Sequence, residues 1–200
     1  MSERVSKSDL RREVRGRLLR LSEEERRLWS DSICANLGVL MGEQIKSEGA
    51  VGVFSPMAVE PDISRWTLEL MGKRSVCFPR MAEDLGSGAM QFFKVSKPGD
   101  LLLEPRFGGR WMEPALTCDL VRPEEMAVIL VPFVALDSSG SRLGHGGGFY
   151  DRYLAQLRSE AMRVAVGFEI QQVTEVPSER HDVKVDALVT EAGVRWFPRA

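Results

Sequence analysis

The sequence predicts a three-layer α/β/α fold with a largely parallel, Rossmann-like open sheet. Helical and strand patterns alternate along the chain, as they do in proteins built from βαβ units. The most continuously apolar run, residues 127–134, is typical of a strand buried on both faces of a parallel sheet. A cluster of glycines lies between this strand and the next helical pattern, as in turns that bind phosphate.

The composition narrows the class of protein. The chain has 200 residues, of which 44% are hydrophobic, so we expect one compact domain over residues 1–200. The net charge of -2 argues against a nucleic-acid or membrane partner. Three widely spaced cysteines argue against a disulfide framework and a structural zinc site. The N-terminus is charged and no apolar run is long enough to cross a bilayer, which argues against secretion and membrane insertion. The cysteine usage fits a reducing cytoplasm, and we expect a cytoplasmic monomer.

An amphipathic pattern covers residues 6–21. Apolar side chains recur there every four residues, which predicts a helix with one buried stripe. That stripe consists of Leu10, Val14 and Leu18. A neighbouring stripe carries three cations, and such charges most often form a solvated helix face. They are Lys7, Arg11 and Arg15.

A second helix is predicted to begin at Ser22. The segment Ser22-Glu23-Glu24-Glu25 matches a capping box, in which the serine accepts from the third amide and Glu25 reaches back. The core-facing stripe of this helix comprises Leu28 or Trp29, Ile33, Leu37 and Leu40.

A short strand is expected over residues 50–54, and the loop after it carries Glu60. A glutamate just past a strand is most often solvated, but such loops also form ligand sites in open α/β sheets. Asp62 is then expected to cap a third helix through Trp66 and Leu70.

Further strands are expected along the rest of the chain. The first of them, residues 75–78, should stop at Pro79, and residues 90–95 alternate as an edge strand does. Trp111 lies in an irregular segment, where it could stack on a flat ring or cover the core. A helical pattern over 152–158 is followed by strands at 163–168, 187–190 and 194–197.

The glycine cluster calls for a physical explanation. Glycine adopts positive φ readily and lacks Cβ, so backbone N–H groups can close on an anion there. Arg142 precedes the cluster and could pair with phosphate, and Asp151 follows it and could hold a divalent ion. We expect Gly147 to have positive φ or to lie against bound phosphate. The alternative is a tight strand-to-helix turn, and the segment matches neither a Walker A loop nor a dinucleotide fingerprint.

Two segments are similar to a known family. Residues 131–137 (VPFVALD) and 140–154 (GSRLGHGGGFYDRYL) resemble the signature of the 5-formyltetrahydrofolate cyclo-ligases, also called methenyltetrahydrofolate synthetases. The resemblance extends more thinly over residues 7–190. It implies ATP- and Mg²⁺-dependent closure of 5-formyltetrahydrofolate to 5,10-methenyltetrahydrofolate, with release of ADP and phosphate.

The resemblance also implies roles for particular residues. It places ATP against Lys7, Arg11, Arg142, Leu143, Gly144, His145, Gly146, Gly147, Gly148, Phe149 and Tyr150. Catalysis is implied for Lys7, Arg142 and Glu60, and contact with the reduced folate for Glu60, Gly147, Tyr150 and Trp111. Residues 183–190 resemble the segment whose aspartate joins a second aspartate at magnesium, which implies Asp151 and Asp186 as the metal ligands.

Several alternatives remain open at the level of sequence. Asp186 could be a solvent-facing aspartate at the start of a strand, and His181 in the same polar loop has no second histidine beside it for a metal. A relative on the same fold could act on another phosphorylated or formylated small molecule. A nucleotide-binding module without catalysis is a further possibility, because fold alone does not determine function.

Overall fold

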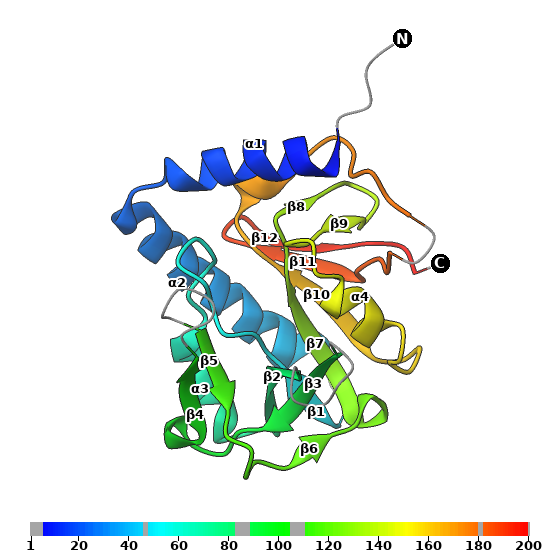
Figure 1. Ribbon diagram of the computed structural model, residues 1–200. Coiled ribbons are helices and arrows are strands. Elements are labelled where there is room, and N and C mark those ends of the chain that lie inside the picture. The colour runs from blue at the N-terminus through cyan, green and yellow to red at the C-terminus, as the bar shows by residue number, and fades with distance from the viewer. Residues whose placement is uncertain (1–5, 46–47, 83–88, 105–110, 180–181, 200) are drawn as a thin grey trace.

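The computed structural model describes residues 6–45, 48–82, 89–104, 111–179 and 182–199 (Figure 1). Within these residues, eight strands form one sheet in the order β12-β11-β10-β7-β1-β2-β3-β6. The five inner strands from β11 to β2 run parallel, and antiparallel pairs complete both sides. The predicted largely parallel α/β fold is therefore confirmed.

The elements follow one another along the chain with these bounds. The α-helices are α1 (Lys7–Leu19), α2 (Glu23–Val39), α3 (Ser64–Met71) and α4 (Phe149–Leu154), and a π-helical turn, η1 (Leu40–Gln44), extends α2. The strands of the large sheet are β1 (Ala50–Gly52), β2 (Val76–Ala82), β3 (Ala89–Lys94), β6 (Leu120–Val121), β7 (Met126–Pro132), β10 (Met162–Val166), β11 (Ala187–Thr190) and β12 (Gly193–Trp196). Two small hairpins pair β4 (Leu101–Glu104) with β5 (Trp111–Pro114) and β8 (Ala135–Leu136) with β9 (Arg142–Leu143).

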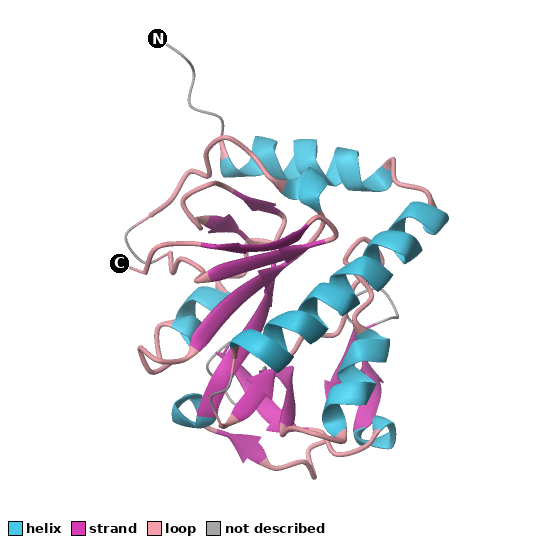
Figure 2. Ribbon diagram, turned by 180° about the vertical axis from the view of Figure 1, so that it is seen from behind, coloured by secondary structure: helices cyan, strands magenta, loops and turns pink. Residues whose placement is uncertain are grey.

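Apolar side chains cover both faces of the sheet. Helices α1, α2 and α3 pack on one face, and Figure 2 shows α2 crossing in front of the strands with α1 above them. The short helix α4 covers the other face. Successive residues of β7 alternate between the two sides, since Val128 and Leu130 belong to the first cluster and Ile129 and Val131 to the second. This alternation explains why the run is apolar without interruption.

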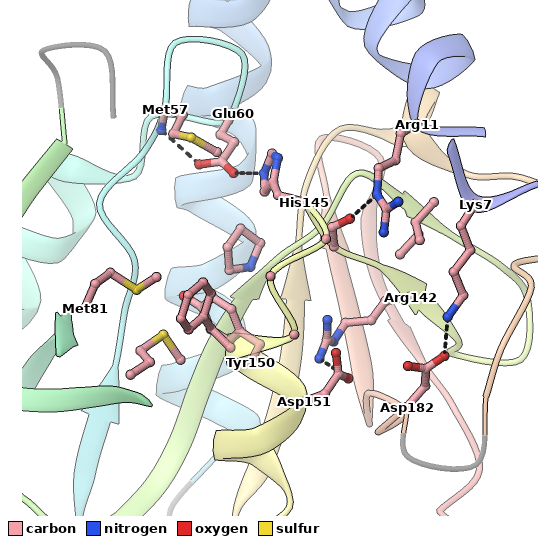
Figure 3. Close-up of a pocket in the computed structure, with 18 of the residues that line it drawn as sticks. Lys7, Arg11, Met57, Glu60, Met81, Arg142, His145, Tyr150, Asp151 and Asp182 are labelled. Atoms are coloured by element: carbon pink, nitrogen blue, oxygen red, sulfur yellow. Dashed lines mark hydrogen bonds and ion pairs between the residues drawn. The ribbon is translucent and has the colours of Figure 1, made fainter. Parts of the chain in front are cut away.

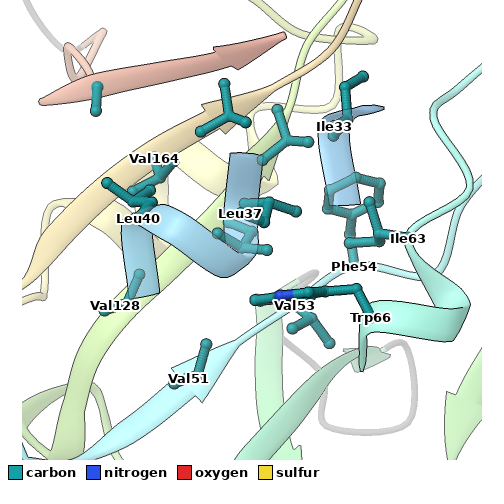
Figure 4. Close-up of a cluster of buried hydrophobic side chains, with 14 of the residues drawn as sticks. Ile33, Leu37, Leu40, Val51, Val53, Phe54, Ile63, Trp66, Val128 and Val164 are labelled. Carbon is teal, nitrogen blue, oxygen red and sulfur yellow. The ribbon is translucent and has the colours of Figure 1, made fainter. Parts of the chain in front are cut away.

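Helix α2 forms as its local sequence predicts. The backbone N–H of Glu25 donates to Ser22 Oγ at 3.1 Å, and Ser22 N donates to Glu25 Oε2 at 2.8 Å, which completes the capping box. The stripe of Ile33, Leu37 and Leu40 is fully buried (Figure 4). Each of these side chains contributes about 2 kcal/mol to folding through burial.

Helix α1 also matches its pattern. Ser6 Oγ caps it by accepting from the Asp9 amide, and the predicted stripe is buried in the same cluster as α2. In α3, by contrast, Asp62 lies one residue before the N-cap position, although its Oδ1 accepts from the Ser64 amide at 3.0 Å.

One predicted strand boundary was wrong. Strand β2 continues through Pro79 to Ala82, and Pro79 lies opposite Phe92 of β3. The reason is that β1 pairs with β2 only at Val76 and Cys77. The Cys77 carbonyl accepts from the Val53 amide, so it faces β1. The nitrogen of Pro79, two residues later, faces the same side. Because β1 no longer pairs there, the strand loses no hydrogen bond at the proline.

The path of the chain creates a topological switch point between β1 and β7. From β1 the chain passes through α3 to β2 on one side, and from β7 it passes through α4 to β10 on the other. Loops at the carboxyl ends of two such strands separate and leave a crevice. Those two loops carry Glu60 and the glycine cluster. No helix within the described residues could span a membrane.

Candidate functional site

A cavity of about 540 Å³ lies at the switch point, at the carboxyl end of β7 and beneath the N-terminal half of α1 (Figure 3). Charged side chains line one side of it and apolar side chains the other. The charged side includes Lys7, Arg11, Arg142, Asp151, Glu179 and Asp182. The apolar side includes Met57, Met81, Met90, Trp111, Phe149 and Tyr150. The glycine loop runs between the two sides. The volume of the cavity is in the range of small-molecule sites.

The backbone geometry of the glycine loop agrees with the prediction at two glycines and differs from it at a third. Gly146 and Gly148 have φ of +113° and +64°, conformations that other residues rarely adopt. Gly147 does not have positive φ, so the first of the two conditions expected for it is not met, and its position against bound phosphate stays a prediction. A Cβ on Gly147 would instead lie 2.4 Å from the Phe149 ring. The predicted helix at 152–158 begins earlier, at Phe149, which places Asp151 in its first turn.

Helix α1 brings two predicted cations to the cavity. Arg11 Nε donates to the Gly144 carbonyl at 2.8 Å, so the guanidinium holds the start of the glycine loop. Lys7 Nζ bonds Glu179 Oε1 at 2.9 Å and Asp182 Oδ2 at 3.0 Å. Burial acts to lower the pKa of Lys7, but the two carboxylates outweigh it and raise the pKa above its usual value. Lys7 is therefore charged at neutral pH.

Arg142 and Asp151 form a buried ion pair at the floor of the charged side. Arg142 Nη2 donates to Asp151 Oδ1 at 2.7 Å, and the Arg142 side chain is only 3% exposed. Burial lowers the pKa of Arg142, against the effect of Asp151, yet a guanidinium stays charged. Its buried Nε has no partner among the described residues. Buried donors are normally hydrogen-bonded, so this N–H suits an anionic ligand in the cavity.

Glu60 is buried at the top of the cavity rather than solvated. Its Oε2 accepts from the Met57 amide at 2.9 Å, and its Oε1 lies 3.1 Å from His145 Nε2. The second ring nitrogen of His145 lies 3.3 Å from Arg15 Nη2. The loop after β1, the glycine loop and α1 therefore meet at this imidazole.

Aromatic and thioether side chains form the apolar side. The Tyr150 hydroxyl is buried and has no hydrogen-bond partner among the described residues, and burial raises its pKa. Trp111 lies on β5 with its indole N–H 3.2 Å from Glu113 Oε1. It is partly exposed and lines the cavity, so it does not simply cover the core. Leu143, which precedes the loop, is a buried residue of β9.

Asp186 is not brought to Asp151, contrary to the predicted pairing. Its Oδ1 lies 3.0 Å from Arg199 Nε, and its Oδ2 accepts from the Arg163 amide at 2.8 Å. The residue precedes β11 and therefore lies at the amino end of that strand, whereas the cavity lies at the carboxyl end of β7. The acidic residues that line the cavity from the preceding loop are Glu179 and Asp182.

The sequence did not assign three further groups to the site, namely Glu179, Arg15 and the three methionines. Arg15 was on the cationic stripe, and its four-residue spacing from Arg11 was the signal that could have included it. Glu179 lies in a polar loop without periodicity, so no local pattern pointed to it. His181, in the same loop, lies outside the described residues. No group of three acidic, histidine or cysteine side chains suited to a metal occurs in the described part of the chain.

Comparisons with known proteins identify the family to which the chain is similar. Residues 3–191 match the sequence model of the 5-formyltetrahydrofolate cyclo-ligase family. A 5-formyltetrahydrofolate cyclo-ligase of Mus musculus is 26% identical over 196 residues, which cover 93% of this chain and 94% of that protein. One from Haemophilus influenzae is 42% identical over 84 residues, or 40% of this chain and 44% of that protein.

Solved structures give the same result. The NMR structure of 5,10-methenyltetrahydrofolate synthetase from Aquifex aeolicus superposes with a TM-score of 0.81 at 30% identity, covering 97% of this chain and 94% of that one. A 5,10-methenyltetrahydrofolate synthetase from Mycoplasma pneumoniae has a TM-score of 0.75 at 18% identity, covering 94% and 99% of the two chains. At that identity the second similarity supports the fold alone.

Proposed function

The chain belongs to the 5-formyltetrahydrofolate cyclo-ligase family, and we propose that it closes 5-formyltetrahydrofolate to 5,10-methenyltetrahydrofolate with the cleavage of ATP to ADP and phosphate. The observation that carries the proposal is the meeting of three distant segments at one cavity. Lys7 and Arg11 come from α1, Glu60 from the loop after β1, and Arg142 from β9.

The chemistry needs activation of a poor electrophile. An N-formyl group is an amide, so its carbon reacts slowly with the neighbouring N10. Transfer of the γ-phosphoryl group to the formyl oxygen makes that oxygen a leaving group. N10 then attacks the formyl carbon and releases its proton, and phosphate departs to leave the methenyl bridge. This sequence requires no nucleophilic side chain, so the work of the protein is positioning and charge stabilisation.

We assign the charged side of the cavity to the triphosphate of ATP. The cations Lys7, Arg11 and Arg142 would neutralise phosphate charge, and the buried Arg142 Nε would gain the partner that it lacks. The backbone of the glycine loop would supply N–H groups at close range, because Gly144 and Gly146 have no Cβ there. These atoms bind and orient the nucleotide.

Asp151 fits a magnesium ion that arrives with the nucleotide. Such ions commonly use one or two carboxylates, with phosphates and water completing the octahedron. Both hydrogen bonds described for Asp151 involve Oδ1, from Arg142 and from the Val183 amide, while the carboxylate lines the cavity. The bound ion would polarise the transferring phosphoryl group. Asp182 lines the same cavity as Asp151, whereas Asp186 does not, and we propose Asp182 as the second carboxylate near the metal.

We assign the apolar side to the reduced folate. The Trp111 and Tyr150 rings and the methionine thioethers suit a flat heterocycle, and the buried Tyr150 hydroxyl could donate to it. The Glu60 carboxylate would accept from N–H groups of the ring. An adjoining hollow of about 1160 Å³ shares Met57, Glu60 and Trp111 with the cavity, so the remainder of the folate has an open path.

The assay is the conversion itself. Purified protein with Mg·ATP and 5-formyltetrahydrofolate should produce the near-ultraviolet absorbance of the methenyl product, together with one ADP for each product. Omission of ATP is the control and should abolish the signal. ATP hydrolysis without the absorbance would point to another formylated or phosphorylated substrate. If the folded protein neither binds ATP nor converts the folate, the proposal is refuted.

We also propose a cytoplasmic monomer that binds neither nucleic acid nor membrane. Residues of one chain supply both the charged and the apolar side of the cavity. The three cysteines are unpaired, as is usual in a reducing compartment. Light scattering during size-exclusion chromatography should give the mass of one chain.

A further inference from the structure

We propose that His145 is a positioning residue that fixes the Glu60 carboxylate for the folate, and that Arg15 selects the tautomer in which it does so. The inference rests on the proposed function, because it assigns Glu60 to the folate. It adds an acting side chain to a loop whose proposed role is otherwise carried by its backbone. It also gives α1 a role at the folate end of the cavity.

The carboxylate of Glu60 is held at both oxygens by two different segments. The Met57 amide donates to Oε2 at 2.9 Å from within the same loop, and His145 lies 3.1 Å from Oε1 across the cavity mouth (Figure 3). The last torsion of a glutamate side chain is broad when nothing constrains it. Two bonds at opposite oxygens set the plane of the group. The Glu60 side chain is only 5% exposed, so water competes little for these bonds.

A fixed plane matters for the proposed ligand. Each carboxylate oxygen has two lone pairs, so one on each oxygen remains after the two observed bonds. Two adjacent N–H donors of a planar ring can bond such a pair of oxygens only if ring and carboxylate are coplanar. With His145 absent, one oxygen would lose its partner and the group could turn about its axis. The folate would then have to order the carboxylate when it binds, which weakens affinity.

Arg15 determines which nitrogen of His145 carries the proton. Its Nη2 lies 3.3 Å from His145 Nδ1, and a guanidinium can only donate hydrogen bonds. Nδ1 must therefore accept, so the single proton of the neutral ring is on Nε2. That nitrogen faces Glu60, and its N–H donates to Oε1. The opposite tautomer would direct N–H toward the Arg15 cation and a lone pair toward the carboxylate, so both contacts would be lost.

The arrangement connects α1 to the Glu60 loop through the glycine loop. Arg11 and Arg15 are one helical turn apart, and they bond Gly144 and His145, which are adjacent in the loop. Arg12 lies on the same helix but pairs with Asp9 away from the cavity. It is a matched control, because it has the same side chain on the same element without the contact to His145.

The kinetic test compares the KM values for the two substrates. In His145→Ala we expect the KM for 5-formyltetrahydrofolate to rise about tenfold, as for the loss of one bond to a charged group, with the KM for ATP within about twofold. His145→Gln should restore most of the affinity, because its amide can donate to Glu60 and accept from Arg15. Arg15→Ala should raise the folate KM by about threefold and Arg12→Ala should not change it. Equal effects of Arg15→Ala and Arg12→Ala would overturn the role of Arg15.

A double-mutant cycle tests whether His145 acts through Glu60. In a Glu60→Ala background, His145→Ala should change the folate KM by less than about twofold, since the carboxylate that it positions is gone. If the two changes multiply instead, His145 acts independently and the proposal fails. Melting temperatures without ligand identify any variant that is merely unstable.

A spectroscopic measurement needs no activity. The chain has two histidines, so ¹⁵N labelling of histidine gives two ring systems, and His145→Gln removes one of them to assign the other. We expect His145 to be protonated on Nε2 at neutral pH and to change its tautomer distribution in Arg15→Ala. Protonation on Nδ1 in the wild type would overturn the inference. Failure of the wild type to convert the folate would refute the proposed function separately, without altering this spectrum.

Discussion

At the scale of single residues, the Arg142–Asp151 pair connects the stability of the protein with its proposed chemistry. The Arg142 side chain is almost completely buried, and the charges of Arg142 and Asp151 neutralise each other. A buried pair of this kind is weak evidence for stability, but breaking it is costly. The more informative feature is that Arg142 and Tyr150 leave polar atoms unsatisfied at the same cavity.

Replacement of Asp151 by asparagine should abolish turnover. The change keeps side-chain volume but removes the anionic ligand proposed for Mg²⁺, so we expect a fall of about a hundredfold or more in kcat. It should also lower the free energy of unfolding by about 1–3 kcal/mol, because Arg142 loses its counter-charge. Turnover is measured over a titration of Mg²⁺, with exposed Asp119→Asn as the control. Full activity of Asp151→Asn at limiting Mg²⁺ would exclude the metal role.

Cys77 should make the protein sensitive to alkaline pH. Burial raises the pKa of this thiol to about 12, and the pKa of a cysteine in the unfolded chain is near 9.0. Between these values the folded state keeps a proton that the unfolded state has lost, so stability falls as pH rises above about 9. The contribution is at most about 1.4 kcal/mol per pH unit.

Urea unfolding of the wild type and Cys77→Ala measures this effect. The free energy of unfolding of the wild type should fall more steeply than that of the variant above about pH 9, and the two should run parallel below about pH 8. Parallel curves over the whole range would show that the thiol is not the cause.

At the scale of elements, α1 is a helix whose buried stripe places cations over a site formed by other segments. Leu10, Val14 and Leu18 are 5%, 0% and 3% exposed, so the helix is firmly packed. Docking by this stripe leaves Lys7 and Arg11 at the edge of the cavity, next to the glycine loop. In the sequence the two cations precede that loop by more than a hundred residues.

Lys7→Ala should therefore affect catalysis more than stability. Ion pairs that are partly exposed contribute about 1 kcal/mol or less, so the melting temperature without nucleotide should change little. The KM for ATP should rise about tenfold, or kcat should fall by a similar factor, because a charged contact to phosphate is lost. Arg12→Ala serves as the control on the same helix. Wild-type ATP kinetics in Lys7→Ala would contradict the assignment of α1 to the nucleotide.

At the scale of the whole molecule, one apolar cluster joins the two ends of the described chain. It contains Leu10 of α1, Leu37 of α2, Val128 of β7 and Val189 of β11. A core that takes residues from so many elements favours unfolding as a unit, and this supports the expectation of one domain over residues 1–200.

Equilibrium unfolding in urea should then be a single transition. The four tryptophans of the chain include Trp29 on α2, Trp66 on α3 and Trp196 on β12, so fluorescence reports on two helices and on the edge strand. We expect the midpoint from fluorescence to coincide with that from circular dichroism, and Mg·ATP to shift both together. Separate midpoints, or a shift of only one probe, would indicate two units.

Local sequence determined the elements whose stabilising contacts lie within a few residues. The capping box at Ser22, the buried stripes of α1 and α2 and the doubly buried strand β7 follow from hydrogen bonds and periodicities of short range. The family signature likewise lies in one continuous run around the glycine loop. For these features the chain needs no information about distant partners, so pattern and propensity were sufficient.

The tertiary structure decided which distant side chains meet. Asp186 and Asp182 are only four residues apart in the sequence. The register of β11 beside β10 places Asp186 in an ion pair with Arg199, whereas Asp182 bonds Lys7 at the cavity. The contact of Arg15 with His145 depends in the same way on how α1 docks, and the continuation of β2 past Pro79 depends on where β1 stops pairing. Strand register and helix docking are set by packing over the whole core, and no local pattern contains them.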